Sequence, residues 1–120
     1  MTKKSGKGLG RLYNAFRWSM SGLRATFLQE EAFRQELLLS LILAPLALYL
    51  GNTGVEKALL LGSLFFVLVV ELLNSAVEAA VDRVGMEENH LAGQAKDMGS
   101  AAVFLSLLNL VVVWMFIILS

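Results

Sequence analysis

Apolar side chains recur along residues 9–27 at offsets of 0, 3, 4, 7, 11, 14 and 18 from Leu9. This spacing matches one face of a helix with about 3.6 residues per turn. Polar and basic side chains, Arg11 and Arg24 among them, fall mainly on the other faces. The pattern would suit a soluble helix packed on other protein, but it is also typical of a helix lying among lipid headgroups. With the apolar runs that follow, it predicts an amphipathic surface helix over about residues 8–28.

Three apolar runs come next, over residues 37–50, 58–81 and 98–119. As a helix, the first run would reach about 21 Å, which is short of the ~30 Å hydrocarbon core of a bilayer. It must therefore begin earlier, near residue 31, or sit in a thinned bilayer. The other two runs are long enough to span. The pattern predicts transmembrane helices over about residues 31–50, 55–82 and 96–119, with a polar loop over residues 82–97.

The composition supports a membrane protein. Of the 120 residues, 57% are apolar and only 17% are charged. A chain this short cannot hide so much apolar surface from water in its own interior. The composition therefore excludes an ordinary soluble monomer, and it is the opposite of that of a disordered chain. We expect one integral-membrane domain over residues 1–120, of the all-α class.

The charges are balanced but unevenly placed. Ten Lys and Arg residues offset ten Asp and Glu residues, and no nucleic-acid partner is expected. Seven of the ten basic residues lie within the first 34 positions, and the predicted polar loop carries Arg83 and Lys96. The positive-inside rule then places the N-terminus and this loop in the cytoplasm. The absence of cysteine excludes disulfides and thiolate metal sites.

The second membrane helix is predicted to carry a column of polar side chains. Glu71, Asn74, Glu78 and Asp82 are spaced i, i+3, i+7 and i+11, which places them on one face. A carboxylate inside a membrane helix costs about 2–3 kcal/mol even on lenient scales. A carboxylate desolvated by apolar surroundings can act as a general base, and one near the aqueous rim can hold Mg²⁺. The alternative is that these acids only link helices through hydrogen bonds or ion pairs.

Other chemistry is sparse. The sequence has no nucleotide-binding loop of the G-x-x-x-x-G-K-[ST] or G-x-G-x-x-G type. The single histidine, His90, has no partner for a zinc site and is expected to be exposed to solvent. Trp18 and Trp114 are interpreted as anchors at the membrane interface, with packing inside the protein as the alternative.

Several separated segments resemble one family, the prokaryotic integral-membrane diacylglycerol kinases. Residues 71–83 resemble its signature, and residues 95–103 its second block. The N-terminal block is matched by residues 22–25 and 30–36. The resemblance runs over essentially the whole chain, with the segments in the same order.

The resemblance implies a homotrimer in the bacterial cytoplasmic (inner) membrane, each subunit with three transmembrane helices and an amphipathic surface helix. It implies transfer of the γ-phosphoryl group from MgATP to a lipid hydroxyl, in composite sites shared between subunits. By the resemblance, Glu71 is the base and Asn74 positions the reacting groups, while Glu30 and Glu78 hold Mg²⁺. Nucleotide contacts are implied for Arg11, Trp18, Glu30, Glu78, Glu87, Glu88, Asn89, Lys96 and Asp97. Lipid contacts are implied for Arg11, Glu31, Ala32, Phe33, Arg34, Gln35, Glu71 and Ser100.

Diacylglycerol is the expected lipid, because residues 96–103 resemble the diacylglycerol enzymes more than the undecaprenol kinases of the same fold. Undecaprenol phosphorylation remains an alternative. A small proton-coupled transporter using Glu71 is an alternative of another class, since such proteins also keep an intramembrane Glu. A passive membrane scaffold is a third.

Overall fold

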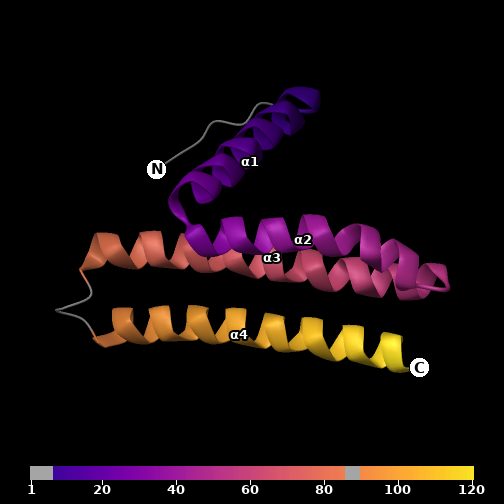
Figure 1. Cartoon of the computed structure of the whole chain (residues 1–120). Coiled ribbons are helices and arrows are strands. Elements are labelled where there is room, and N and C mark those ends of the chain that lie inside the picture. Colours follow the sequence, from indigo (N-terminus) through magenta and orange to yellow (C-terminus); the bar gives the residue numbers. More distant parts are fainter. Residues whose placement is uncertain (1–6, 86–89) are drawn as a thin grey trace.

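The protein is all-helical over the residues that its computed structural model describes, 7–85 and 90–120 (Figure 1). Four helices follow one another along the chain: α1 (Leu9–Gln29), α2 (Glu31–Leu50), α3 (Gly54–Val84) and α4 (His90–Leu119). Three of them, α2, α3 and α4, are long and apolar enough to cross a membrane. The predicted fold class, an all-α protein with three helices long and apolar enough to span a membrane, is confirmed at this level.

The segment predicted as a polar loop is mostly helical, so that expectation was wrong over much of its length. Helix α3 continues to Val84, and α4 already begins at His90. The hydropathy pattern marks where a helix leaves the apolar layer, whereas the backbone hydrogen bonds continue into water for as long as the residues favour a helix. At Gly85 the backbone turns with a φ of 95°, a conformation that favours glycine, and α3 ends there.

Helix α3 lies between α2 and α4 and forms the centre of the bundle. Ala47 of α2, Leu60 and Leu64 of α3, and Leu110 of α4 meet in one buried cluster. Trp114 joins this cluster and is only 9% exposed. Its Nε1 donates a hydrogen bond of 3.1 Å to the hydroxyl oxygen of Ser63. The interpretation of Trp114 as an interface anchor was therefore wrong, because its indole N–H finds its partner inside the bundle.

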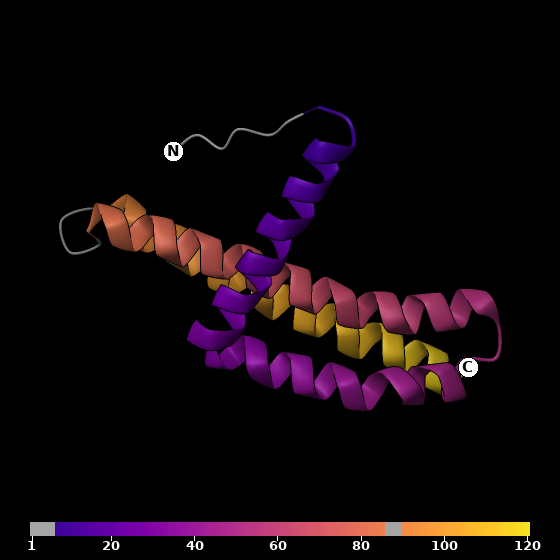
Figure 2. The ribbon, with the colours of Figure 1, turned by 90° about the horizontal axis from the view of Figure 1, so that it is seen from above.

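Helix α1 leaves this bundle at a steep angle (Figures 1 and 2). Seen from above, it crosses the line of α3. No residue of α1 is buried. A single extended residue, Glu30, with φ −117° and ψ 111°, separates α1 from α2. This elbow places the second half of α1 over the end of α3 that carries the polar column.

Candidate functional site

A cavity of about 490 Å³ lies between the second half of α1 and the second half of α3. Its acidic lining comes from Glu30 at the elbow and from Glu78 and Asp82 of α3. Small side chains of α1, Gly22 and Thr26 among them, form the opposite wall. The fold thus brings together carboxylates that lie far apart in the sequence.

Burial changes in steps along the polar face of α3. Glu71 is only 6% exposed, Asn74 and Glu78 are half-buried, and Asp82 is exposed. This graded burial follows from the helical spacing, since each residue lies about a turn further from the apolar centre of the helix. The polar column therefore has one desolvated carboxyl group and, nearer the end of the helix, carboxyl groups that water can reach.

The carboxyl group of Glu71 has a close partner on α2. It lies within hydrogen-bonding reach of the side chain of Glu36 and within electrostatic reach of Glu30 and Glu78. A carboxylate can only accept hydrogen bonds, so a bond between two carboxyl groups needs a proton on one of them. Glu36 is half-buried at the start of the first apolar run. The sequence pattern did not predict a role for Glu36, although an ionisable side chain at the start of a membrane helix indicates a functional residue.

Asn74 reaches across to α4 at Gly99. A Cβ atom built on Gly99 would collide with the side-chain oxygen of Asn74 and would lie 3.3 Å from its Cγ. This oxygen is buried, and it has no hydrogen-bond partner within the part of the chain that the structure describes. An orphaned acceptor of this kind calls for explanation in a native protein, and a functional role is one explanation.

An ion pair joins the ends of α3 and α4 at Asp82, the last residue of the polar column. The Nζ atom of Lys96 lies 2.8 Å from a carboxylate oxygen of Asp82. Both side chains are partly open to solvent, so water screens the pair and it adds little to stability. The ion pair therefore matters more for placing a positive charge near the carboxylates than for stability.

The donor set can be tested against Mg²⁺. Among residues 7–85 and 90–120, no group of three or more His, Cys, Asp and Glu side chains is arranged to hold a metal ion. Mg²⁺ bound with a nucleotide, however, needs only one or two carboxylates, because phosphate oxygens and water supply the other ligands. Glu30 and Glu78 line one cavity and provide such a pair. The residues fit Mg²⁺ that arrives with phosphates, and they do not form a closed cage.

Several predicted site residues lie outside this cluster within one chain. Arg11 is exposed in the first turn of α1, and along the helix it is about 28 Å from Glu30. Trp18 is half-buried on the same helix, while Asp97 and Ser100 are exposed on α4. Glu87, Glu88 and Asn89 lie outside the described residues. The predicted His90 exposure is confirmed.

The segment predicted to contact lipid, residues 31–35, forms the first turns of α2 next to the elbow. Phe33 is buried and lines an apolar groove of about 470 Å³ with residues of α1 and α3, Phe27 and Leu72 among them. Arg34 donates hydrogen bonds of 2.6 and 3.2 Å to the backbone oxygens of Phe27 and Leu28. Gln35 donates to Glu31 over 3.4 Å, and both are exposed, as is Ala32.

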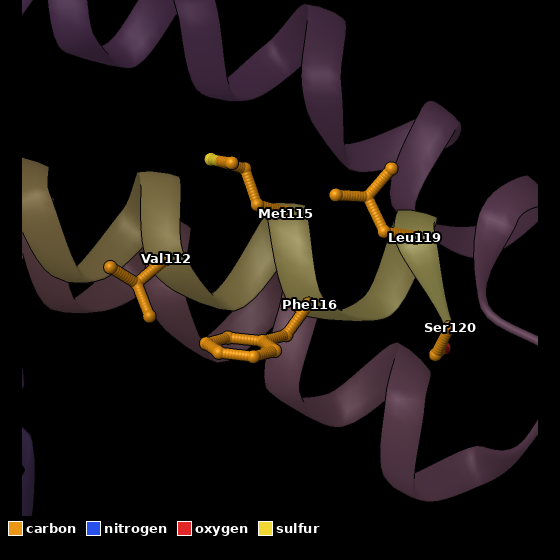
Figure 3. A pocket seen from close by; sticks show the side chains of 5 residues that line it. All are labelled: Val112, Met115, Phe116, Leu119 and Ser120. Carbon is orange, nitrogen blue, oxygen red and sulfur yellow. The ribbon is translucent and has the colours of Figure 1, made fainter.

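A further hollow, of about 430 Å³, lies at the C-terminal end of α4 (Figure 3). Its lining residues, Val112, Met115, Phe116, Leu119 and Ser120, include no charged side chain. They end the chain at the opposite end of α4 from Lys96 and Gly99. None of the carboxylates of the acidic cavity lines this hollow.

Comparison with known proteins gives this arrangement a family. The family model described as prokaryotic diacylglycerol kinase matches residues 17–118. A diacylglycerol kinase of Haemophilus influenzae is 48% identical over 107 residues, which is 89% of this chain and 91% of that protein. Those of Pseudomonas aeruginosa and Escherichia coli are 47% and 42% identical over 117 and 113 residues, or 98% and 94% of this chain and 95% and 93% of those proteins.

The chain belongs to the prokaryotic diacylglycerol kinase family. The match spans the second half of α1 and nearly all of α2, α3 and α4, so it contains every carboxylate of the cavity. Membership in the diacylglycerol kinase family confirms the resemblance that the separated sequence segments indicated. Glu36 and Gly99 also fall within the matched region.

Proposed function

We propose that this protein is a lipid kinase that transfers the γ-phosphoryl group of ATP to the hydroxyl group of diacylglycerol, producing phosphatidic acid. The observation that carries the proposal is the buried carboxyl group of Glu71. It lies on α3, a helix long enough to span a membrane, and within electrostatic reach of Glu30 and Glu78. Family membership and relatives named diacylglycerol kinase support the substrate and the reaction.

Glu71 is the general base in this proposal. Its carboxylate takes the proton of the lipid hydroxyl as the lipid oxygen bonds to the γ-phosphorus atom. The bond from that phosphorus to the β,γ-bridging oxygen breaks, and ADP leaves. Phosphoryl transfer depends mainly on positioning and electrostatic stabilisation, so the protein needs no covalent intermediate. The buried side-chain oxygen of Asn74 is free to orient the hydroxyl group.

Glu30 and Glu78 are the residues that would hold Mg²⁺. When bound, Mg²⁺ would neutralise charge on the ATP phosphates. The carboxylates of Glu30 and Glu78 come from different elements and line the same cavity, so between them they could hold Mg²⁺ that arrives with one nucleotide. Lys96, beside Asp82, supplies positive charge next to this cavity.

A homotrimer with sites shared between subunits accounts for the remaining nucleotide contacts. Arg11 and Trp18 lie along α1, away from the carboxylates of their own chain, and Asp97 is exposed on α4. Glu87, Glu88 and Asn89 belong to the same proposed set. Many large apolar side chains of α2, α3 and α4 are exposed in the single chain, which leaves surface for neighbouring copies as well as for lipid. We therefore assign the nucleotide site to residues of two subunits.

The lipid would enter from the side of the elbow. The apolar groove beside Phe33 provides space for an acyl chain close to Leu72, the neighbour of Glu71. Glu31, Ala32, Arg34 and Gln35 lie at the start of α2, where the headgroup would meet the base, and Ser100 is assigned to the same site. We place the protein in the bacterial inner membrane with its N-terminus in the cytoplasm, where ATP is available, and with α1 as an amphipathic helix on the membrane surface.

One assay separates the candidate functions. The purified protein in mixed micelles is supplied with γ-labelled ATP, Mg²⁺, and diacylglycerol and undecaprenol side by side. The proposal predicts label in phosphatidic acid. Label only in undecaprenyl phosphate would redirect the proposal to the undecaprenol alternative, and no labelled lipid at all would contradict a lipid kinase and favour a transporter.

A further inference from the structure

The end of α1 has backbone oxygens that its own helix cannot satisfy. The N–H of Glu30 donates to the carbonyl oxygen of Thr26 over 2.8 Å, and this is the last bond of the helix. The next two carbonyl groups, of Phe27 and Leu28, would need N–H donors from a continued helix. At Glu30 the backbone instead turns to an extended conformation. Helix ends leave such carbonyl groups to be satisfied by caps, side chains or water.

The guanidinium group of Arg34 supplies these donors from the first turns of α2. Its Nη1 atom lies 2.6 Å from the oxygen of Phe27 and 3.2 Å from that of Leu28. A cation at a helix C-terminus also interacts favourably with the helix dipole. The last turn of α1 contains no basic residue of its own, so Arg34 provides that charge from the neighbouring helix.

Most of α1 is exposed. None of its residues is buried, and it leaves the bundle at a steep angle (Figures 1 and 2). Yet Gly22, Thr26 and Gln29 of α1 form one wall of the acidic cavity, opposite Glu78 of α3. The shape of this cavity therefore depends on the angle at the elbow.

We propose that Arg34 is a positioning residue, whose guanidinium group fastens the end of α1 to the start of α2 and so holds α1 over the carboxylates of α3. The buried ring of Phe33 supports the elbow from its apolar side, next to Phe27. The part of this inference that concerns catalysis rests on the proposed lipid kinase activity. The part that concerns the elbow does not.

Amide hydrogen exchange of the full-length protein in lipid nanodiscs, without nucleotide, tests the elbow directly. Arg34→Ala is expected to speed exchange of the amides of residues 26–30 about tenfold, because the last turn of α1 then opens locally. Exchange in the middle of α3 should be unchanged, which shows that the variant is folded. Arg34→Lys should be intermediate, since an ammonium group lacks the fork of a guanidinium. Arg83→Ala removes an exposed arginine elsewhere and serves as the matched control.

Steady-state kinetics test the consequence for the site. Arg34→Ala should raise the KM for MgATP about fivefold with a smaller loss of kcat, because only the fraction of molecules with α1 in place binds the nucleotide. Unchanged exchange at residues 26–30 in both Arg34 variants would overturn the role in the elbow, and an unchanged KM for MgATP in Arg34→Ala would overturn its consequence for the site. Absence of lipid phosphorylation by the unaltered protein would contradict the proposed function, and the exchange result would still decide the elbow. Should Arg34→Ala fail to fold, Arg34→Lys alone decides both measurements.

Discussion

Gly99 of α4 leaves open the space that the side chain of Asn74 occupies on α3. A Cβ atom at position 99 would collide with the Asn74 oxygen. The consecutive helices α3 and α4 are thus matched at a polar residue of the candidate site. Because Gly99 has no side chain, the side chain of Asn74 can occupy this conformation.

Gly99→Ala should therefore impair the enzyme more than it impairs the fold. The added methyl group forces Asn74 to move, and such overpacking typically costs about 1–3 kcal/mol, partly offset by the better helix propensity of alanine. Because Asn74 is assigned to position the reacting groups, we expect activity to fall at least ~10-fold. Thermal unfolding and lipid phosphorylation measured on the same preparation check this.

Gly93→Ala is the matched control for that experiment. Gly93 lies on the same helix, and nothing lies within 4 Å of a Cβ atom built there. It should keep full activity and equal or greater stability. An active Gly99→Ala protein, or equal losses in both variants, would argue against the role given to Asn74.

The proximity of the Glu36 and Glu71 carboxyl groups predicts a distinct pattern of variants. Glu36→Gln retains a group that can donate to the Glu71 carboxylate, so most activity should remain. Glu36→Ala leaves the buried Glu71 without this partner. A hydrogen bond to a charged group is worth about 1.5–3 kcal/mol, so we expect a loss of roughly 10- to 100-fold.

The comparison is made by measuring kcat and KM for both substrates. If Gln and Ala at position 36 were equally harmful, Glu36 would have a role other than holding Glu71 in position. If both were harmless, the pair would have no importance for the reaction.

Glu30→Ala and Glu78→Ala should each change how the reaction depends on Mg²⁺. Each variant removes one of the two carboxylates assigned to the metal, so more Mg²⁺ is needed for half-maximal rate, on the order of 10-fold or more. Titration of Mg²⁺ at fixed ATP measures this. Glu56→Gln, at the other end of α3, is the control, because it keeps the oxygen that accepts from Asn52. An unaltered Mg²⁺ requirement in both alanine variants would remove the metal assignment.

The hydrogen bond between Trp114 and Ser63 predicts a change in stability alone. Trp114→Phe removes the buried N–H donor and some contact area at the centre of the bundle. We expect a loss of about 1–2 kcal/mol in unfolding free energy with the kinetic constants per folded molecule unchanged. Unfolding in a denaturing detergent and assays of the remaining folded protein measure the two effects. A changed KM for MgATP would instead link the bundle core to the site.

The local pattern along the chain predicts a good part of this structure. The polar face of α3 follows from positions 71, 74, 78 and 82 because helical periodicity is a local property. The depth of Glu71 follows from the apolar residues around it. What such periodicity cannot specify is the register between helices. The pairing of Glu36 with Glu71 and the fit of Asn74 at Gly99 depend on how α2 and α4 are packed against α3.

The two errors have the same origin. Residues 82–97 are polar, but polarity says nothing about where the helix ends. Trp114 lies near the end of α4, as an interface anchor would, and only the packing of Ser63 against it shows that it is buried. In both cases the local sequence pattern lacks the tertiary contacts that determine the structure.

The most direct test of the central claim is single-turnover phosphoryl transfer by Glu71→Gln in mixed micelles, with binding of MgATP measured on the same protein. Glutamine keeps the size of the side chain but cannot accept the proton of the lipid hydroxyl. The account predicts that MgATP still binds with an affinity close to that of the unaltered protein, while the rate of transfer to diacylglycerol falls by at least ~10²-fold. Transfer at the normal rate by Glu71→Gln would contradict it.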